Sequence, residues 1–193
     1  MKIRKETAVV LHEYAQHLKG LNSEDRYTRF GYSVKDETID QIILNVLYHP
    51  QDHHLFVAEV DNKIVGFGHL AREGADWELA VSVDRDCQGQ GIGNALMDEM
   101  IKWGKIHNVH SVFMHCITEN RKIQHLARKH GLRTVERSGA EITAQVELPN
   151  PTIVDYTRNY LEEQKKLISE MTELQKKFWA SLNPGAIFDT AET

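Results

Sequence analysis

The feature that most constrains this chain is a glycine-rich loop at residues 84–96, DRDCQGQGIGNAL, with glycines at positions 89, 91 and 93. A run of β-forming residues, LAVSV, precedes the loop, and apolar side chains recur at helical spacing after it. Glycine permits positive φ angles, so several N–H groups and a helix N-terminus can converge on an anion. The loop therefore predicts either a site for a pyrophosphate or a strand-to-helix turn that binds nothing.

Two common phosphate-binding motifs do not fit this loop. A P-loop needs GxxxxGK followed by Ser or Thr, and no Lys-Ser or Lys-Thr pair follows these glycines. A dinucleotide fingerprint needs GxGxxG, but the third glycine position counted from Gly89 and Gly91 is occupied by Asn94. The P-loop is excluded, and a dinucleotide site is strongly disfavoured.

The rest of the chain up to residue 148 alternates between helical and strand periodicity. Helices are expected over 6–20, 39–47, 92–107 and 120–130, with Ser23 capping a further helical segment, so that the first fifty residues are mostly helical. Strands are expected at 54–60, 63–71, 77–83, 111–117, 134–138 and 142–148, with Asp61 and Asn62 at a hairpin bend. This order predicts a mixed α/β sheet with helices on both faces.

A second segment follows Pro149-Asn150-Pro151, in which Asn150 is expected to cap a helix that runs to residue 182. Tyr160, Leu167, Met171, Leu174 and Phe178 form one apolar stripe, and five basic residues balance five acidic ones. This amphipathic extension, residues 149–182, is expected either to form a homodimer or partner contact or to fold back on its own core. Residues 183–193 are expected to be a flexible tail.

Composition narrows the possible partners. The net charge of −5 disfavours nucleic-acid binding, and no apolar run is long enough for a signal peptide or a membrane span. Two cysteines cannot build a disulfide framework, which favours a cytoplasmic protein. The eleven histidines have no cysteine partners and no HExxH spacing, so no metal site is expected.

Within the loop, Gln88-x-x-Gly91-x-Gly93 resembles the acyl-CoA pyrophosphate motif of the GNAT N-acetyltransferase superfamily, which also lies between a strand and a helix. The segment TENRKIQHLARKHGL at 118–132 resembles the second signature of that family. Asn120 matches the Asn of that signature, which usually contacts the acyl-CoA arm. The resemblance covers most of residues 1–148. It implies a GNAT-like α/β (α+β) domain whose central sheet is mixed and largely antiparallel, flanked by helices, with the long C-terminal helix added.

The resemblance also implies a co-substrate and the residues that bind it. The co-substrate is acetyl-CoA, and no metal is required. Pantetheine is expected to pair with the strand at Val81 and Val83, where a backbone N–H near Val81 can polarise the thioester oxygen. The remaining binding residues are expected to be Gln88, Gly89, Gln90, Gly91, Ile92, Gly93, Asn94 and Asn120.

Three stretches, LNSEDRYTRFG, WELAVSV and ENRKIQHLARKHG, resemble the bacterial protein-lysine acetyltransferase branch in particular. A free lysine amine is uncharged in only about one molecule in 2,500 at pH 7, so direct attack on a thioester needs a base. The resemblance places that base at Glu78. Many family members carry a Tyr seven residues after the helix Asn as the acid, but Ala127 stands here, and a thiol is a good leaving group without one.

The sequence leaves three functions open. The first is an N-acetyltransferase acting on a protein lysine with Glu78 as general base, and the second is an acetyltransferase for a small amine or polyamine. The third is a non-catalytic acyl-CoA sensor or assembly module, which Ala127 and the C-terminal helix would favour. Arg26 and Arg29 are expected either to border the acceptor cleft or to form surface ion pairs.

Overall fold

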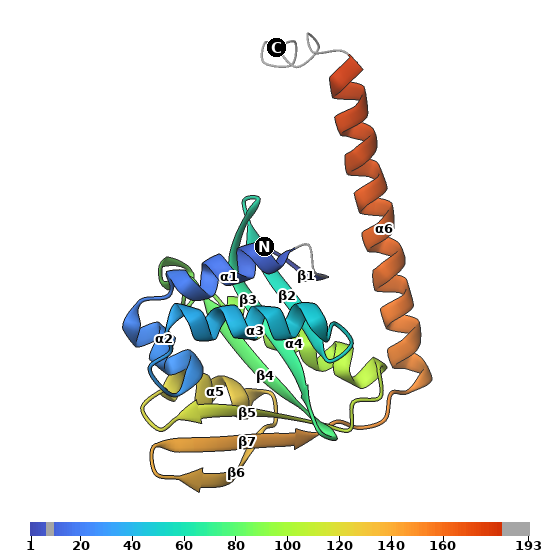
Figure 1. Ribbon diagram of the computed structural model, residues 1–193. Coiled ribbons are helices and arrows are strands. Elements are labelled where there is room, and N and C mark those ends of the chain that lie inside the picture. The colour runs from blue at the N-terminus through green and yellow to red at the C-terminus, as the bar shows by residue number, and fades with distance from the viewer. Residues whose placement is uncertain (7–9, 183–193) are drawn as a thin grey trace. The chain divides into compact units, whose positions relative to one another are not determined.

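The computed structural model describes residues 1–6 and 10–182, and the chain divides into two compact units, residues 1–150 and 151–193. The flexible tail expected at 183–193 lies outside the described residues. Figure 1 shows the larger unit as a sheet with helices on both faces.

Seven strands form one sheet in the order β1-β2-β3-β4-β5-β7-β6. Neighbouring strands pair antiparallel except β4 and β5, which are parallel. This confirms the mixed, largely antiparallel sheet. The strands are β1 (Lys2–Glu6), β2 (His53–Val60), β3 (Lys63–Glu73), β4 (Asp76–Val83), β5 (Ser111–Ile117), β6 (Arg133–Ser138) and β7 (Glu141–Glu147).

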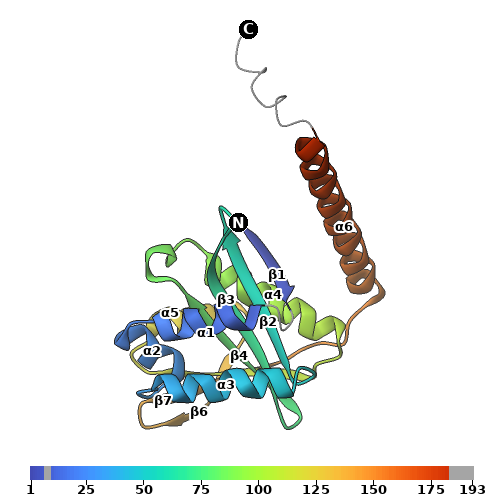
Figure 2. The same cartoon turned by 45° about the horizontal axis from the view of Figure 1, so that its top comes forward.

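Helices cover both faces of this sheet, as Figures 1 and 2 show. One face carries α1 and α3, which pack against each other, together with α2, and the opposite face carries α4 and α5. The short 3-10 turn η2 (Arg85–Cys87) leads from β4 into the glycine loop. The helix bounds are α1 (Leu11–Gly20), α2 (Ser23–Phe30), α3 (Asp36–Tyr48), α4 (Ile92–Ile106) and α5 (Arg121–Lys129).

Side chains alternate between the two faces along each central strand. In β3, Leu70 joins the core beneath α4, whereas Phe67 joins the core beneath α1 and α3. A Cβ added to Gly68 would lie 2.9 Å from the Met100 sulfur, so this glycine lets α4 pack close to the sheet. The hairpin bend is confirmed, because Asp61 and Asn62 both have positive φ between β2 and β3.

Two expectations about the N-terminal helical segments are wrong. The first helix was expected to begin at residue 6, but residues 2–6 form the edge strand β1, which pairs with β2, and α1 begins at Leu11; the first fifty residues are otherwise mostly helical, as expected. Asn22, and not Ser23, caps α2, since the Asn22 side chain accepts a hydrogen bond from the Asp25 N–H. An Asn side chain at that position caps as well as a Ser does, so the helix begins one residue earlier than expected.

The second unit contains the helix α6 (Ile153–Leu182), which begins after the expected cap. Thr152 caps it in place of Asn150: the Asp155 carboxylate accepts from the Thr152 N–H at 2.8 Å, and the Thr152 hydroxyl accepts from the Asp155 N–H at 3.3 Å. The predicted apolar stripe is exposed, as at Leu174, 67% of whose surface is accessible. In the described part of the chain, no helix is long and apolar enough to span a bilayer.

Candidate active site

The site begins where β4 and β5 separate. These parallel strands pair only at Trp77 with Val112 and at Glu78 with Phe113, while β5 pairs with β7 over its whole length. Beyond Glu78, β4 therefore diverges from its neighbour and leaves a slot in the middle of the sheet. This is the opening that pairing of pantetheine with the strand would require.

The backbone of β4 directs polar groups into this slot. The Asp84 N–H donates to the Val65 carbonyl of β3 at 2.9 Å. Because successive residues of a strand point their backbone groups to alternate sides, Val81 and Val83 point theirs away from β3, toward the slot. The Val83 carbonyl accepts from Gln88 Nε2 at 3.2 Å, which ties the glycine loop to the end of the strand.

The glycine loop then turns into the N-terminus of α4. Gly89 and Gly91 have φ values of 78° and 82°, and Gly91 is the N-cap of the helix. A side chain at either position would be strained, and no side-chain cap takes up the first N–H groups of α4. The loop thus presents free N–H groups at the positive end of a helix dipole, where a pyrophosphate is favoured.

A groove of about 1280 Å³ runs along this loop between α4 and α5. Nine of the ten predicted cofactor residues line it: Val81, Val83, Gln88, Gly89, Gly91, Ile92, Gly93, Asn94 and Asn120. Gln90 does not line it, and its side chain instead donates to the Asp86 carbonyl at 3.3 Å. Among the described residues, the buried Asn94 Oδ1 has no hydrogen-bond partner, while Asn94 Nδ2 donates to Asp98 Oδ2 at 2.9 Å.

Helix α5 forms the other wall of the groove and supplies cations that sequence reasoning missed. Arg121, Lys122 and Lys129 line the groove and suit a ligand that carries several phosphates. The signal was present, since Lys122 and Lys129 stand seven residues apart on one helical face. Asn120 caps this helix by accepting from the Ile123 N–H at 3.1 Å, and Ala127 is buried in the core beneath α4 and α5.

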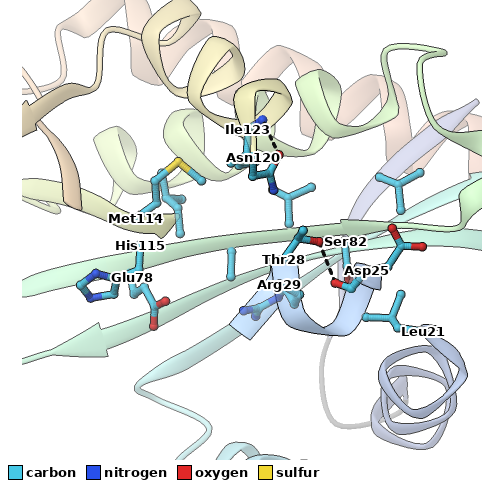
Figure 3. Close-up of a pocket in the computed structure, with 14 residues that line it drawn as sticks. Leu21, Asp25, Thr28, Arg29, Glu78, Ser82, Met114, His115, Asn120 and Ile123 are labelled. Atoms are coloured by element: carbon cyan, nitrogen blue, oxygen red, sulfur yellow. Dashed lines mark hydrogen bonds between the residues drawn. The ribbon is translucent and has the colours of Figure 1, made fainter. Parts of the chain in front are cut away.

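A smaller pocket of about 80 Å³ lies at the inner end of the slot and contains Glu78 (Figure 3). Residues of β4 and β5 form its floor, and Asp25, Thr28 and Arg29 of α2 line it from the other side. Arg29 therefore borders the pocket, whereas Arg26 pairs with Asp36 at 2.8 Å. Alternation along β4 points Trp77 to the face opposite Glu78, where it stacks on His54.

Buried polar side chains surround this pocket on the α1 face. The Tyr14 hydroxyl and His69 Nδ1 are 3.2 Å apart, and both side chains are almost fully buried. Burial raises the pKa of Tyr14; the nearby Arg29 cation lowers it, and the Glu78 carboxylate raises it further. Tyr14 lies in the helix expected over 6–20, and nothing in the local pattern marks its hydroxyl as a hydrogen-bonding group.

Another polar group lies at the outer end of the same face. Ser82 Oγ is 2.8 Å from His17 Nε2, and His17 Nδ1 is 3.0 Å from an Asp84 carboxylate oxygen. Burial lowers the pKa of His17, while Asp84 raises it. None of these three side chains was singled out in the sequence, because their contacts join residues that lie far apart along the chain.

Comparison with known proteins identifies the architecture. Residues 18–132 match the family model described as the acetyltransferase (GNAT) family. The fold is similar to the ribosomal-protein-alanine N-acetyltransferase from Brucella melitensis (21% identity, 77% of this chain and 100% of that one, TM-score 0.58). It is also similar to the GNAT domain of S. lividans PAT (15% identity, 76% and 89%, TM-score 0.63).

A third solved structure bears on the co-substrate. The PaiA N-acetyltransferase from Thermoplasma acidophilum was solved in complex with coenzyme A and is similar over 76% of this chain and 99% of its own (18% identity, TM-score 0.58). The family model spans more than half of the present chain and includes both the glycine loop and Asn120. The chain therefore belongs to the GNAT family and is an N-acetyltransferase that uses acetyl-CoA.

Proposed function

We propose that this enzyme transfers the acetyl group of acetyl-CoA to a protein lysine by direct attack, with Glu78 as the general base. The position of Glu78 carries the proposal. It is the last residue of β4 that pairs with β5, and its side chain lines the pocket at the inner end of the slot. A carboxylate at this place can take a proton from an amine that approaches a thioester held along β4.

Each step has a residue suited to it. Glu78 would accept the ammonium proton and leave a neutral amine, which attacks the thioester carbon. The Val81 N–H points into the slot and would donate to the oxygen as negative charge develops there. The thiolate then leaves without a dedicated acid, because Ala127 offers no proton and a thiol needs little help.

Two observations support a lysine acceptor. The pocket of about 80 Å³ has room for the head of an amine, which suits a lysine that reaches in from a protein surface. Its lining holds two carboxylates, Asp25 and Glu78, against one cation, Arg29, and this excess of negative charge attracts a cation. The three sequence segments that resemble the protein-lysine branch point the same way.

The test is Glu78→Gln, which keeps the shape of the side chain and removes the base. Acetyl transfer to a lysine peptide should fall about 10²- to 10⁴-fold, while acetyl-CoA affinity measured by calorimetry changes little. The matched control is Glu136→Gln on the exposed strand β6, which should leave transfer unchanged. Equal turnover in wild type and Glu78→Gln would remove Glu78 from the mechanism.

A panel of acceptors separates the alternatives. It contains a lysine peptide, a peptide with a free N-terminal alanine, spermidine and a protein lysate read by mass spectrometry. Three of the solved structures with this fold are named as ribosomal-protein-alanine acetyltransferases, which is why the second peptide is included. Transfer to spermidine alone would overturn the lysine proposal, and acetyl-CoA binding without transfer to any acceptor would favour the sensor.

We also propose that α6 joins two copies of the chain. Its stripe of Tyr160, Leu167, Met171, Leu174 and Phe178 is exposed along the helix and follows a seven-residue repeat. The helix carries no net charge, so a second copy meets no electrostatic repulsion. The cytoplasmic location expected from the sequence stays a prediction.

Light scattering of the full chain tests this dimer. Leu167→Asp with Leu174→Asp places charges on the stripe and should halve the measured mass. Ser169→Asp with Thr172→Asp places the same charges on the other side of the helix and should leave the mass unchanged. A wild-type mass equal to one chain at micromolar concentration would contradict the proposal.

A further inference from the structure

We propose that Ser82, His17 and Asp84 form a second catalytic group, which hydrolyses acyl-CoA through an acyl-serine intermediate. The established activity transfers an acyl group to an amine and needs no nucleophilic serine. This inference concerns a different reaction, with water as the acceptor, at the outer end of the same slot.

The three side chains are arranged as a nucleophile (Ser82), a base (His17) and a carboxylate that orients the base (Asp84). His17 Nε2 lies 2.8 Å from Ser82 Oγ, and His17 Nδ1 lies 3.0 Å from Asp84 Oδ1. A carboxylate can only accept, so Asp84 fixes the proton on Nδ1 and leaves the Nε2 lone pair facing the serine hydroxyl. This is the arrangement that activates a serine in hydrolases of unrelated folds.

The surroundings hold the base in its working form. The His17 side chain is 6% exposed, and its ring packs 5.1 Å from that of Phe67. Burial, opposed by Asp84, lowers the pKa of His17, so the imidazole is neutral near pH 7 and can accept a proton. Asp84 is about half exposed, so its carboxylate lies in contact with water.

Ser82 also lies where a thioester can reach it. It lines the same pocket as Glu78, as Figure 3 shows, and its neighbours Val81 and Val83 direct backbone groups into the slot. The Val83 N–H follows the nucleophile directly, the position from which a hydrolase oxyanion hole takes one of its donors.

The two chemistries occupy separate positions along β4. Glu78 and Ser82 point to the same face but stand four residues apart, which is about 13 Å along a strand. An amine activated at Glu78 and an acyl group attached at Ser82 therefore do not share one reaction centre. Hydrolysis needs the thioester near Val83, and transfer to an amine needs it near Val81.

The reaction balances without a further co-reactant. Ser82 Oγ attacks the thioester carbon, the C–S bond breaks, and His17 passes the hydroxyl proton to the departing thiolate to give free CoA. Water then attacks the serine ester with His17 as the base. The C–O bond to Ser82 breaks, the carboxylic acid leaves, and the serine regains its proton.

The first experiment requires neither acetyl-CoA nor an amine. Diisopropyl fluorophosphate is a small reagent that phosphorylates activated serines, and peptide mass spectrometry locates the adduct. The wild-type protein should be labelled at Ser82 at least about 100-fold faster than at the exposed Ser138. Labelling of the two serines at the same rate would overturn the proposal.

Variants assign the role of each partner. Ser82→Ala should abolish the adduct, and Asp84→Asn, at a half-exposed position that folding tolerates, should slow labelling at least about 10-fold. Asp98→Asn, at a similarly exposed aspartate paired with His130, is the matched control and should leave the rate unchanged. An Asp84→Asn protein that is labelled at the wild-type rate would show that the three residues are only structural.

The second experiment follows acetyl-CoA without an acceptor. The wild type should release CoA and carry one acetyl group on Ser82 in intact and peptide mass spectra, and Ser82→Ala should lose both signals by at least about 100-fold. Labelling by the fluorophosphate is independent of Glu78 chemistry. A failure here therefore leaves the proposed amine transfer standing, and a failure of the Glu78 test leaves this inference standing.

Discussion

The two faces of the sheet differ in what they bury. Beneath α4 and α5 the core is almost wholly apolar, with Leu79, Leu96 and Met100 among its buried side chains. Beneath α1 and α3 the core also buries Tyr14 and His69 beside its apolar residues. Because strand residues alternate, the same β3 and β4 supply both faces.

Burying polar groups is costly unless they are paired, and on the α1 face they are paired in a chain. His69 Nε2 lies 3.0 Å from His53 Nδ1, and His53 Nε2 lies 3.1 Å from the Asn45 amide. When the Asn45 amide donates to His53 Nε2, the Nδ1–H of His53 donates to His69 Nε2. The Nδ1–H of His69 then donates to the Tyr14 hydroxyl. The core beneath α4 and α5 thus serves packing alone, whereas the core beneath α1 and α3 also holds paired polar side chains close to the pocket that Glu78 lines.

The largest expected effect tests the apolar face. Leu96→Ala removes most of a fully buried side chain of α4 and leaves a cavity in the core. It should lower the free energy of unfolding, measured in urea, by about 2–5 kcal/mol. Acetyl transfer per folded molecule should stay near wild type, because Leu96 lines neither pocket.

Leu47→Ala on α3 is the matched control, since 47% of that side chain is exposed, and it should cost less than about 1 kcal/mol. If Leu96→Ala also lost most of its transfer activity while still folded, the division of roles between the two faces would fail.

The division could be predicted from the sequence only in part. Apolar periodicity located the hairpin of β2 and β3, the strand β4 and the helix α4, because each has a strong local pattern. The edge strand β1, KIRKE, has four charged residues in five and no local strand signal; pairing with β2 alone makes it a strand.

The site shows the same limit. The glycine loop and Asn120 are local motifs, so their residues could be named in advance. The contacts of His17 with Ser82 and of Tyr14 with His69 join positions more than fifty residues apart. Nothing in the pattern around Tyr14 or His17 distinguishes a packed ring from a hydrogen-bonded one, since helical spacing only says that both face the core.

A smaller effect tests the polar face. Tyr14→Phe keeps the ring that packs 5.0 Å from Phe67 but removes the hydroxyl that pairs with His69. The buried imidazole nitrogen then loses a partner, which should cost about 1–3 kcal/mol in the free energy of unfolding. The control Tyr32→Phe removes a hydroxyl from a side chain that is 55% exposed and should cost almost nothing. Equal effects of the two variants would show that the buried chain adds no stability.

The smallest effect concerns His54, a titratable side chain on the apolar face. Its ring stacks on Trp77 at 5.3 Å and lies 4.1 Å from the Trp103 ring. Burial, helped by the nearby Lys5, lowers the pKa of His54 from 6.5 to about 4. Between these two values His54 is protonated in the unfolded chain and neutral in the folded one. The free energy of unfolding should therefore fall as the pH drops from about 6.5 to about 4.

His54→Phe isolates this contribution, because Phe keeps an aromatic ring between the tryptophans and does not titrate. The shift corresponds to about 3 kcal/mol, which solvent screening of a half-buried ring reduces to about 1–2 kcal/mol. Urea unfolding at pH 7 and pH 4.5 measures how much the free energy of unfolding falls between the two pH values. This fall should be about 1–2 kcal/mol smaller in His54→Phe than in wild type. His12→Phe, on the exposed side of α1, should keep the wild-type loss. Identical pH dependence in wild type and His54→Phe would mean that acid destabilisation arises at the other histidines whose pKa values burial lowers, which are His17, His53, His69 and His130.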